Sequence, residues 1–407
     1  MNSLSFFREN APFLCAGFLL TFASSFGQTF FISVFAGDIQ RSFDLSHTAW
    51  GGLYMIGTLS SAVLMIWAGT LTDTYRVRVL GKAIIVLLAC ACLSMAALPG
   101  VWFIPVAIFL LRFSGQGMLN HISSVAMTRW FQASRGKALS FASTGYAVGE
   151  ATLPILFVLL LVHFDWRFLW VGSAVLTLCL LPVLARLLRM ERTPQSIVQG
   201  SDSVGMHGKH WTRSDVIRHP LFWFIAPAVV GPSAWITAFF FQQVHLAKIK
   251  GWAHLELVTL FPIYTGVGVV AMILSGFAID RFGSKRLMPI FLSPLIVGFW
   301  LFATADTVFE GTIAMGCLAL ASGANSTVPI AYWAETFGTQ FIGSIKAMAT
   351  ALMVLGSAIG PGLSGFLIDQ GVGFETQLKG FSIFFALACL SVAIGIAVSG
   401  RETPRST

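Results

Sequence analysis

Charged residues are scarce in this chain of 407 residues, because Lys, Arg, Asp and Glu together make up only 10% of it. Soluble globular proteins contain about 25% of these residues. The 56% content of hydrophobic residues and the mean hydropathy of +0.80 agree with this shortage. The composition almost excludes a soluble enzyme and predicts an all-helical integral membrane protein.

The chain also lacks the short motifs of nucleotide hydrolysis and hydrolytic catalysis. It contains no glycine-rich loop that ends in GK[ST], no HExxH and no GxSxG. The six cysteines form no CxxC pair and lie in apolar segments without interleaved His or acid, which indicates small core residues. We therefore expect no enzymatic activity, no metal and no cofactor.

A net charge of +8 would suggest a nucleic-acid partner in a soluble protein, but here the bases lie at the ends of apolar segments. If the N-terminus is cytoplasmic, most of the 25 Lys and Arg residues fall on the cytoplasmic side. Those expected outside are Arg41, Arg167, Lys248, Lys250 and Lys379, and Arg112 falls within the membrane. Positive residues favour the cytoplasmic side, so we expect both termini inside and no nucleic-acid partner.

Twelve segments have the length of about 20 apolar residues that a membrane span requires. The first is followed by no small-residue cleavage site and is expected to be retained. Residues 189–218 form the one long polar gap, which predicts a cytoplasmic linker between an N-terminal half (1–188) and a C-terminal half (219–407) of six helices each. The predicted spans are 11–35, 47–69, 79–98, 101–127, 137–162, 167–188, 220–245, 255–277, 287–305, 308–333, 343–368 and 377–399.

The two halves repeat a pattern. The sequence GTLTDTYRVR, with Gly69 and Asp73, is echoed 207 residues later by GFAIDRFGSKR, with Gly276 and Asp280. The sequence GYAVGEATLP (145–154) is echoed 211 residues later by GSAIGPGLSG (356–365). Two such similar offsets predict a duplication, with two parallel repeats packed around a central path.

At these positions the chain resembles the major facilitator superfamily, whose loop between helices 2 and 3 carries G-x-x-x-D-[RK]-x-G-[RK]-[RK]. The second copy departs only at Ser284, whereas the first is degraded and has Thr74, Arg76 and Val77 where the family has a base, Gly and a base. The resemblance implies transport by alternating access. It also implies a gating role for the matching residues and for Glu335, which lies beside bases at a helix end: Gly69, Asp73, Arg78, Gly276, Asp280, Arg281, Gly283, Lys285 and Glu335.

Three segments, 24–35, 129–150 and 334–347, look like those of bacterial relatives in the monocarboxylate and oxalate:formate porter branch. Antiporters of the superfamily commonly carry GxxxGP in helix 5, but this chain has Glu150 where that proline would fall. The missing proline argues modestly against drug:proton antiport.

Arg112 is the one base predicted to lie inside the membrane, with Gln116 and Asn120 at i+4 and i+8 on one helical stripe. Charge in the bilayer core is costly and is usually retained for function. A guanidinium backed by amides can hold a carboxylate bidentately. The alternative is that Arg112 only pairs with an acid on a neighbouring helix.

Glu150 is the carboxylate predicted to lie farthest from both membrane faces. Burial favours the neutral form of a carboxyl group and a nearby cation favours the ionised form, so a balanced group can load and unload a proton. Glu150 is therefore the proton-coupling candidate, and a static bridge to Arg112 is the alternative. Both interpretations predict contact between these two side chains.

The remaining candidates for a substrate path are polar side chains within spans, each of which can also serve as an interhelical hydrogen bond. They are Gln28, Tyr146, Gln243, Tyr264 and Asn325.

The sequence thus predicts a secondary transporter that moves a small organic anion, monocarboxylate-like, by proton symport, with a proton-antiport exporter of drugs or amphipathic metabolites as the alternative. We expect a monomer in the lipid bilayer. The resemblance to bacterial relatives implies the cytoplasmic (inner) membrane.

Overall fold

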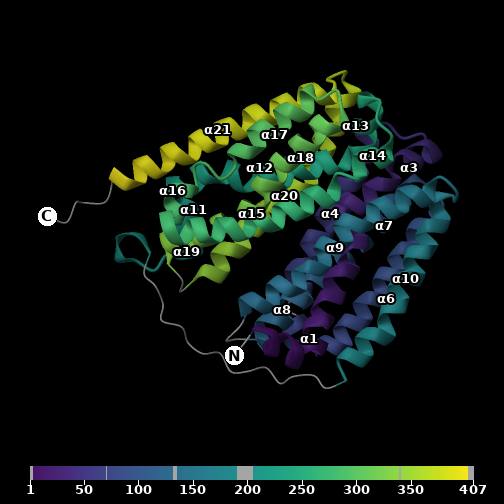
Figure 1. The fold of residues 1–407 in the computed structure, drawn as a ribbon, viewed down its shortest axis with the longest axis horizontal. Coiled ribbons are helices and arrows are strands. Elements are labelled where there is room, and N and C mark those ends of the chain that lie inside the picture. Colours follow the sequence, from purple (N-terminus) through teal and green to yellow (C-terminus); the bar gives the residue numbers. More distant parts are fainter. Residues whose placement is uncertain (1–2, 70, 132–134, 190–204, 339–340, 402–407) are drawn as a thin grey trace. The chain divides into compact units, whose positions relative to one another are not determined.

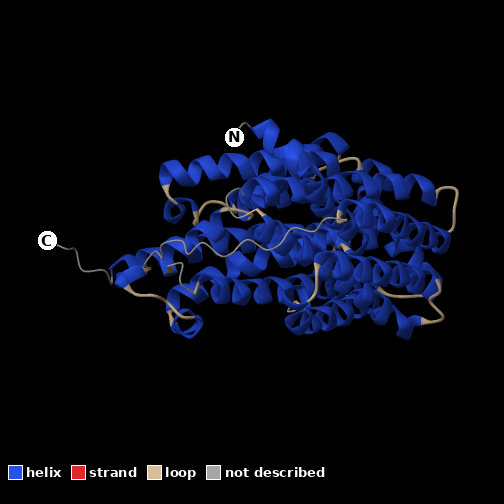
Figure 2. Cartoon of the chain, turned by 90° about the horizontal axis from the view of Figure 1, so that it is seen from below, coloured by secondary structure: helices blue, strands red, loops and turns tan. Residues whose placement is uncertain are grey.

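The computed structural model describes residues 3–69, 71–131, 135–189, 205–338 and 341–401. In this part of the chain every regular element is a helix, and no strand is present (Figure 2). Contacts divide the chain into two compact units, Met1–Gln199 and Gly200–Thr407, called unit 1 and unit 2 below. Residues 190–204 of the predicted linker lie outside the described residues. Its remaining C-terminal part, 205–218, contains two short helices.

Unit 1 holds the first six predicted spans, and several of them are built from more than one helical segment (Figure 1). Its elements are α1 (Ser3–Ser24), η1 (Ser25–Gly27), α2 (Thr29–Ile32), η2 (Ser33–Phe35), α3 (Ala36–Phe43), α4 (His47–Ala68), α5 (Leu71–Thr74), α6 (Val77–Ala96), η3 (Val101–Phe103), α7 (Ile104–Leu111), η4 (Arg112–Leu119), α8 (Asn120–Trp130), α9 (Arg135–Leu161) and α10 (Trp166–Leu187).

Unit 2 repeats this order after a short entry segment. Its elements are η6 (Met206–Gly208), α11 (Arg213–Arg218), α12 (Pro220–Phe241), α13 (Gln243–Lys250), α14 (His254–Val258), α15 (Phe261–Phe282), α16 (Ser284–Leu287), α17 (Ser293–Thr304), α18 (Val308–Asn325), α19 (Val328–Phe337), α20 (Ile342–Asp369) and α21 (Phe374–Arg401).

Eleven helical stretches in the described residues are long and apolar enough to cross a membrane, and they match eleven of the twelve predicted spans. The ninth span, predicted at 287–305, is regular only over the shorter apolar helix α17. Pro289 and Pro294 explain the difference. A proline has no N–H to donate within a helix and clashes with the preceding turn, so the helix begins only beside Pro294.

The two units pack their helices in the same pairs. In unit 1, α1 packs on α9, α4 on α7 and α6 on α10, and in unit 2 the equivalent pairs are α12 on α20, α15 on α18 and α17 on α21. The strongest sequence signal for this packing is the glycine repeat. A Cβ on Gly145 would lie 2.1 Å from the Phe18 carbonyl oxygen, and one on Gly360 would lie 2.1 Å from the Ala234 carbonyl oxygen. Glycine is therefore required where the paired helix backbones meet.

Candidate functional site

The first membrane helix, predicted as one span over 11–35, is broken at Gln28. Its backbone is extended there, with φ −88° and ψ 154°, between the short turn η1 and the new helix start of α2. A break in a helix removes backbone hydrogen bonds, so carbonyls near it need other partners. The Gly27 carbonyl is one of these, and it lies beside Gly115 of the fourth span, where a Cβ would meet the Gly27 Cα at 2.6 Å.

The fourth span changes its helical form at the same level. Residues Arg112–Leu119 form a π-helix, η4, between two α-helical segments. Segments of π-helix are rare and occur often at functional sites. The close approach of Gly27 and Gly115 brings this wider helix against the break in the first span.

Arg112, the first residue of η4, is buried, with 2% of its surface exposed. Its Nη1 donates to the Thr29 hydroxyl at 3.2 Å and to the Gly27 carbonyl at 3.5 Å, and the guanidinium lies 5.5 Å from the centre of the Tyr54 ring. Its Nε has no hydrogen-bond partner among the described residues. The side chain is therefore anchored by neutral groups at one end and retains unused donor capacity.

The predicted contact between Arg112 and Glu150 is wrong for this structure. Within the described ranges, Arg112 makes no ion pair. Glu150 is buried in α9 and accepts a hydrogen bond from the Tyr146 hydroxyl at 3.2 Å. Arg112 is near that same Tyr146 as well as near Tyr54. The break of the first span supplies neutral oxygens that replace a carboxylate as partners of the cation.

The other polar candidates of unit 1 gather around the break. Asn120 accepts from the Ser24 hydroxyl at 3.3 Å and donates to the Gln116 carbonyl at 3.3 Å. Gln28 is buried at the break itself, and Gln116 is half-buried within η4. The structure thus brings Arg112, Asn120 and Gln28 to one region. For Arg112 and Asn120 this agrees with the helical stripe that the sequence predicts.

In unit 2 the equivalent region is neutral. The Tyr264 hydroxyl of α15 lies 2.6 Å from the Ser322 hydroxyl of α18, and Ser275 lies 2.7 Å from Thr327. Asn325 is the last residue of α18, where the tenth span breaks before α19. Gln243 follows the break of the seventh span and lies 3.4 Å from His254. Tyr264 and Asn325 therefore lie on paired helices, whereas Gln243 belongs to the end of the unit that carries α13 and α14.

The family loop of unit 2 has a defined structure around the residue that departs from the motif. Gly283 has a φ of +78°, a value that glycine adopts without strain, and it caps the start of α16. The buried Ser284 donates a hydrogen bond to the Glu335 carboxylate of α19. Asp280, Arg281 and Lys285 are exposed, and Gly276 has open space around its Cα. Ser284 thus replaces the charge of a base with a hydroxyl donor.

The degraded loop of unit 1 is held from the fourth span instead. Arg129 donates to the Thr72 carbonyl at 2.7 Å, and His121 lies 3.2 Å from the Gly69 carbonyl. Asp73 belongs to α5 and Arg78 to the first turn of α6, where it is half-buried. In unit 1 the loop is therefore held by a base of α8, Arg129, whereas in unit 2 it is held by an acid of α19, Glu335.

Sequence reasoning missed two residues of the site, Thr29 and Tyr54. Their hydroxyl oxygens lie 2.6 Å apart, and Thr29 joins this pair to Arg112. A signal was available, because the chain has only 5 Tyr against 37 Phe. A tyrosine inside a span, where phenylalanine is the common choice, indicates that the hydroxyl has a partner.

Comparison with known proteins agrees with this architecture. The sequence profile of the Major Facilitator Superfamily matches residues 17–322, which is more than half of the chain. No curated protein matches the chain.

Among solved structures, a bacterial homologue of the human lysosomal transporter Spinster is similar, with a TM-score of 0.73, 15% identity and coverage of 97% of this chain and 99% of that one. The nucleoside transporter NupG is similar with a TM-score of 0.70, 13% identity and coverage of 96% and 98%. At such identities these structures establish the fold alone. The family match and the shared fold together show that the chain belongs to the major facilitator superfamily of membrane transporters.

Proposed function

We propose that this protein transports a small organic anion, such as a monocarboxylate, together with a proton. Arg112 binds the carboxylate, Glu150 carries the proton, and Gln28, Gln116, Asn120 and Tyr146 line the path in unit 1. Tyr264, Asn325 and Gln243 would supply the polar groups of unit 2.

The observation that carries this proposal is the state of the Arg112 guanidinium. It is buried, it makes no ion pair in the described part of the chain, and its Nε has no hydrogen-bond partner there. A buried cation is strongly stabilised by a counter-ion. The neutral anchors Gly27 and Thr29 hold one end of the guanidinium, so a substrate carboxylate can supply the missing charge through the remaining N–H groups.

The second element is the chain of groups that leads from Arg112 to Glu150. Tyr146 donates to the Glu150 carboxylate and is near Arg112. An anion that binds Arg112 adds a negative charge near Tyr146 and Glu150. A nearby negative charge favours the protonated form of the Glu150 carboxyl group. Anion binding thereby favours proton binding, which is the coupling that symport requires.

The test uses proteoliposomes of the purified protein with a trapped pH-sensitive dye. Short carboxylates are added outside, and protein-free vesicles supply the background, because weak acids also cross bilayers unaided. The account predicts protein-dependent acidification that Glu150→Gln removes. Thr152→Val, on the exposed face of the same helix, is the matched control and should keep full acidification.

Two results would overturn the proposal. Full acidification in Glu150→Gln would exclude this residue as the proton carrier. No response to any carboxylate, combined with a response to lipophilic cations under an imposed pH gradient, would assign the protein to proton-antiport export. That second outcome would also leave Arg112 with a structural role.

A further inference from the structure

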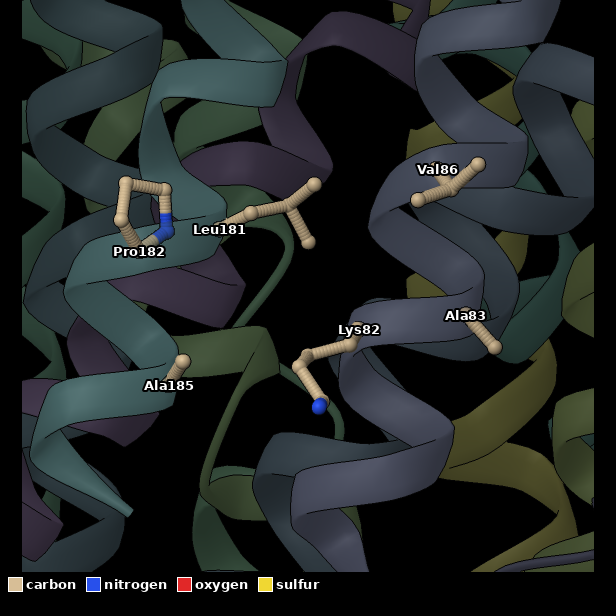
Figure 3. A pocket seen from close by; sticks show the side chains of 6 residues that line it. All are labelled: Lys82, Ala83, Val86, Leu181, Pro182 and Ala185. Atoms are coloured by element: carbon tan, nitrogen blue, oxygen red, sulfur yellow. The ribbon is translucent and has the colours of Figure 1, made fainter. Parts of the chain in front are cut away.

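A groove opens in unit 1 between α6 and α10, and none of the residues that line it belongs to the group around Arg112. Its volume is about 420 Å³, and Figure 3 shows the side chains that line it on the two facing helices. They are Lys82, Ala83, Val86, Leu181, Pro182 and Ala185. Five of these six side chains are hydrocarbon, so the groove is an apolar channel that contains a single cation.

The sequence explains why two packed helices leave a channel here. Ala83 on α6 and Ala185 on α10 are too short to fill the space between the helices. Pro182 lies inside α10 and cannot donate to the preceding turn, which loosens the helix at this level. The groove is therefore built into the paired helices and does not depend on other parts of the chain.

Lys82 is the unusual member of the set. It is the sixth residue of α6, about 8 Å from the helix start at a rise of 1.5 Å per residue. It is half-buried, and in the described residues it makes no ion pair or hydrogen bond. In Figure 3 its nitrogen lies between the two helices. A lysine at this depth needs an anion or must extend to the membrane surface.

More positive charge surrounds the mouth of the groove. Arg78 lies one turn before Lys82 on α6, and Arg186 lies one turn after Pro182 in the last turn of α10. The start of α6 and the end of α10 lie at the same end of the antiparallel pair, which the distribution of bases predicts to be cytoplasmic. Three cations are thus carried by the ends of α6 and α10 at this level.

We propose that this groove binds one anionic phospholipid. The headgroup phosphate lies against Lys82, with Arg78 and Arg186 beside it, and one acyl chain follows the apolar channel along Val86, Leu181 and Pro182. The phosphate of a lipid is the anion that a membrane supplies at this depth, and basic pockets between transmembrane helices are suited to such headgroups. The site is independent of the transported substrate.

The experiment is native mass spectrometry of the full-length purified protein in detergent, with phosphatidylglycerol or phosphatidylcholine of identical acyl chains added. The wild type should retain one phosphatidylglycerol in preference to phosphatidylcholine. Lys82→Gln should reduce this preference about fivefold, since one basic residue near a membrane surface contributes about 1 kcal/mol. Ala185→Phe, which fills the channel and leaves the lysine in place, should reduce retention of both lipids.

Lys379→Gln, on the exposed start of α21, is the control and should behave as the wild type. Inorganic phosphate at millimolar concentration should not displace the lipid, because the acyl chain contributes to binding. Equal retention of phosphatidylglycerol in Lys82→Gln and wild type would overturn the proposal. Displacement by inorganic phosphate would also overturn it, since the site would then bind a free anion. Monodisperse elution of each variant establishes that it is folded.

Discussion

The break in the first span of unit 1 meets a buried arginine. The polar contacts near the breaks in the seventh and tenth spans of unit 2 come instead from amide, imidazole and hydroxyl groups. Arg112 donates to Gly27 and Thr29 in one unit, and Tyr264 pairs with Ser322 in the other. Arg112 and Thr29 lie on the fourth and first spans, whereas Tyr264 and Ser322 lie on the eighth and tenth. The packed helix pairs of the two units are nevertheless the same. The two units share their helix packing and differ in their polar side chains.

The units share their packing but not their polar side chains because glycines at helix contacts and polar residues at the breaks are under different constraints. Gly145 and Gly360 permit backbones to touch, and any larger side chain would separate the paired helices in either unit. Polar side chains at the breaks carry no such constraint, so the two units can diverge there. If unit 1 binds the anion, as proposed, substitutions in the two units should have unequal effects on transport and equal effects on folding.

The largest expected effect is on transport. Arg112→Gln should reduce carboxylate-driven acidification of proteoliposomes by about 100-fold, because hydrogen bonds to a charged group contribute about 1.5–3 kcal/mol. Tyr264→Phe should reduce it by about fivefold at most, as expected for loss of one neutral hydrogen bond of about 1 kcal/mol. An equal loss in both variants would remove the distinction between the units.

The second prediction concerns stability. Gly145→Ala and Gly360→Ala should each destabilise the protein by about 1–3 kcal/mol, the usual cost of forcing extra atoms into packed helices. Thermal unfolding followed by size-exclusion chromatography measures the effect.

Gly52→Ala is the control for this series, since a Cβ there meets no atom within 4 Å. A large loss in Gly145→Ala with none in Gly360→Ala would show that the units do not depend on equivalent helix contacts.

Hydropathy alone predicted twelve spans, and eleven of them are long apolar helices in the described residues, because about 20 apolar residues are needed to cross a bilayer whatever the tertiary structure. It could not predict the break at Gln28 or the π-helix at Arg112. Both lie where Gly27 and Gly115 come into contact, and that contact joins residues 88 positions apart. The partners of Arg112 were missed for the same reason, since Thr29 and Tyr54 reach it only through the fold.

A smaller effect is expected at the family loop of unit 2. Ser284→Ala removes the hydrogen bond to Glu335 and should destabilise the protein by about 1 kcal/mol, whereas Ser284→Thr keeps the hydroxyl and most of the stability. A double-mutant cycle of Ser284→Ala with Glu335→Gln should give a coupling energy of similar size. Additive effects would mean that this hydrogen bond does not hold α16 to α19. Arg129→Gln tests, by the same stability measurement, the hydrogen bond from Arg129 to the Thr72 carbonyl in unit 1.

The smallest effect concerns the entry helix of unit 2. Hydrogen bonds from Thr212, then from Lys209, hold the pKa of Asp215 well below its usual range. A depressed folded pKa stabilises the helix cap above the unfolded value of about 3.9, and the contribution is lost as the pH falls below that value. Amide exchange of Arg213–Arg218, corrected for the intrinsic rate, should therefore accelerate as the pH falls from about 4 to about 2.

Asp215→Asn is the matched control for this pH effect. Its corrected exchange should be faster than the wild type at the higher pH and should change little on acidification. Exchange in the wild type that is independent of pH across this interval would exclude a role for the Asp215 carboxylate in the cap.

Anion binding at Arg112 can be measured directly as equilibrium binding by the purified protein, with calorimetry of lactate and of lactamide, its neutral amide. The account predicts heat of binding for the anion and none for the amide, with anion binding lost in Arg112→Gln and retained in Tyr264→Phe. A panel of other short carboxylates extends the test if lactate is not recognised. Binding of a carboxylate that survives Arg112→Gln, or equal binding of acid and amide, would contradict the assignment of Arg112 as the anion site.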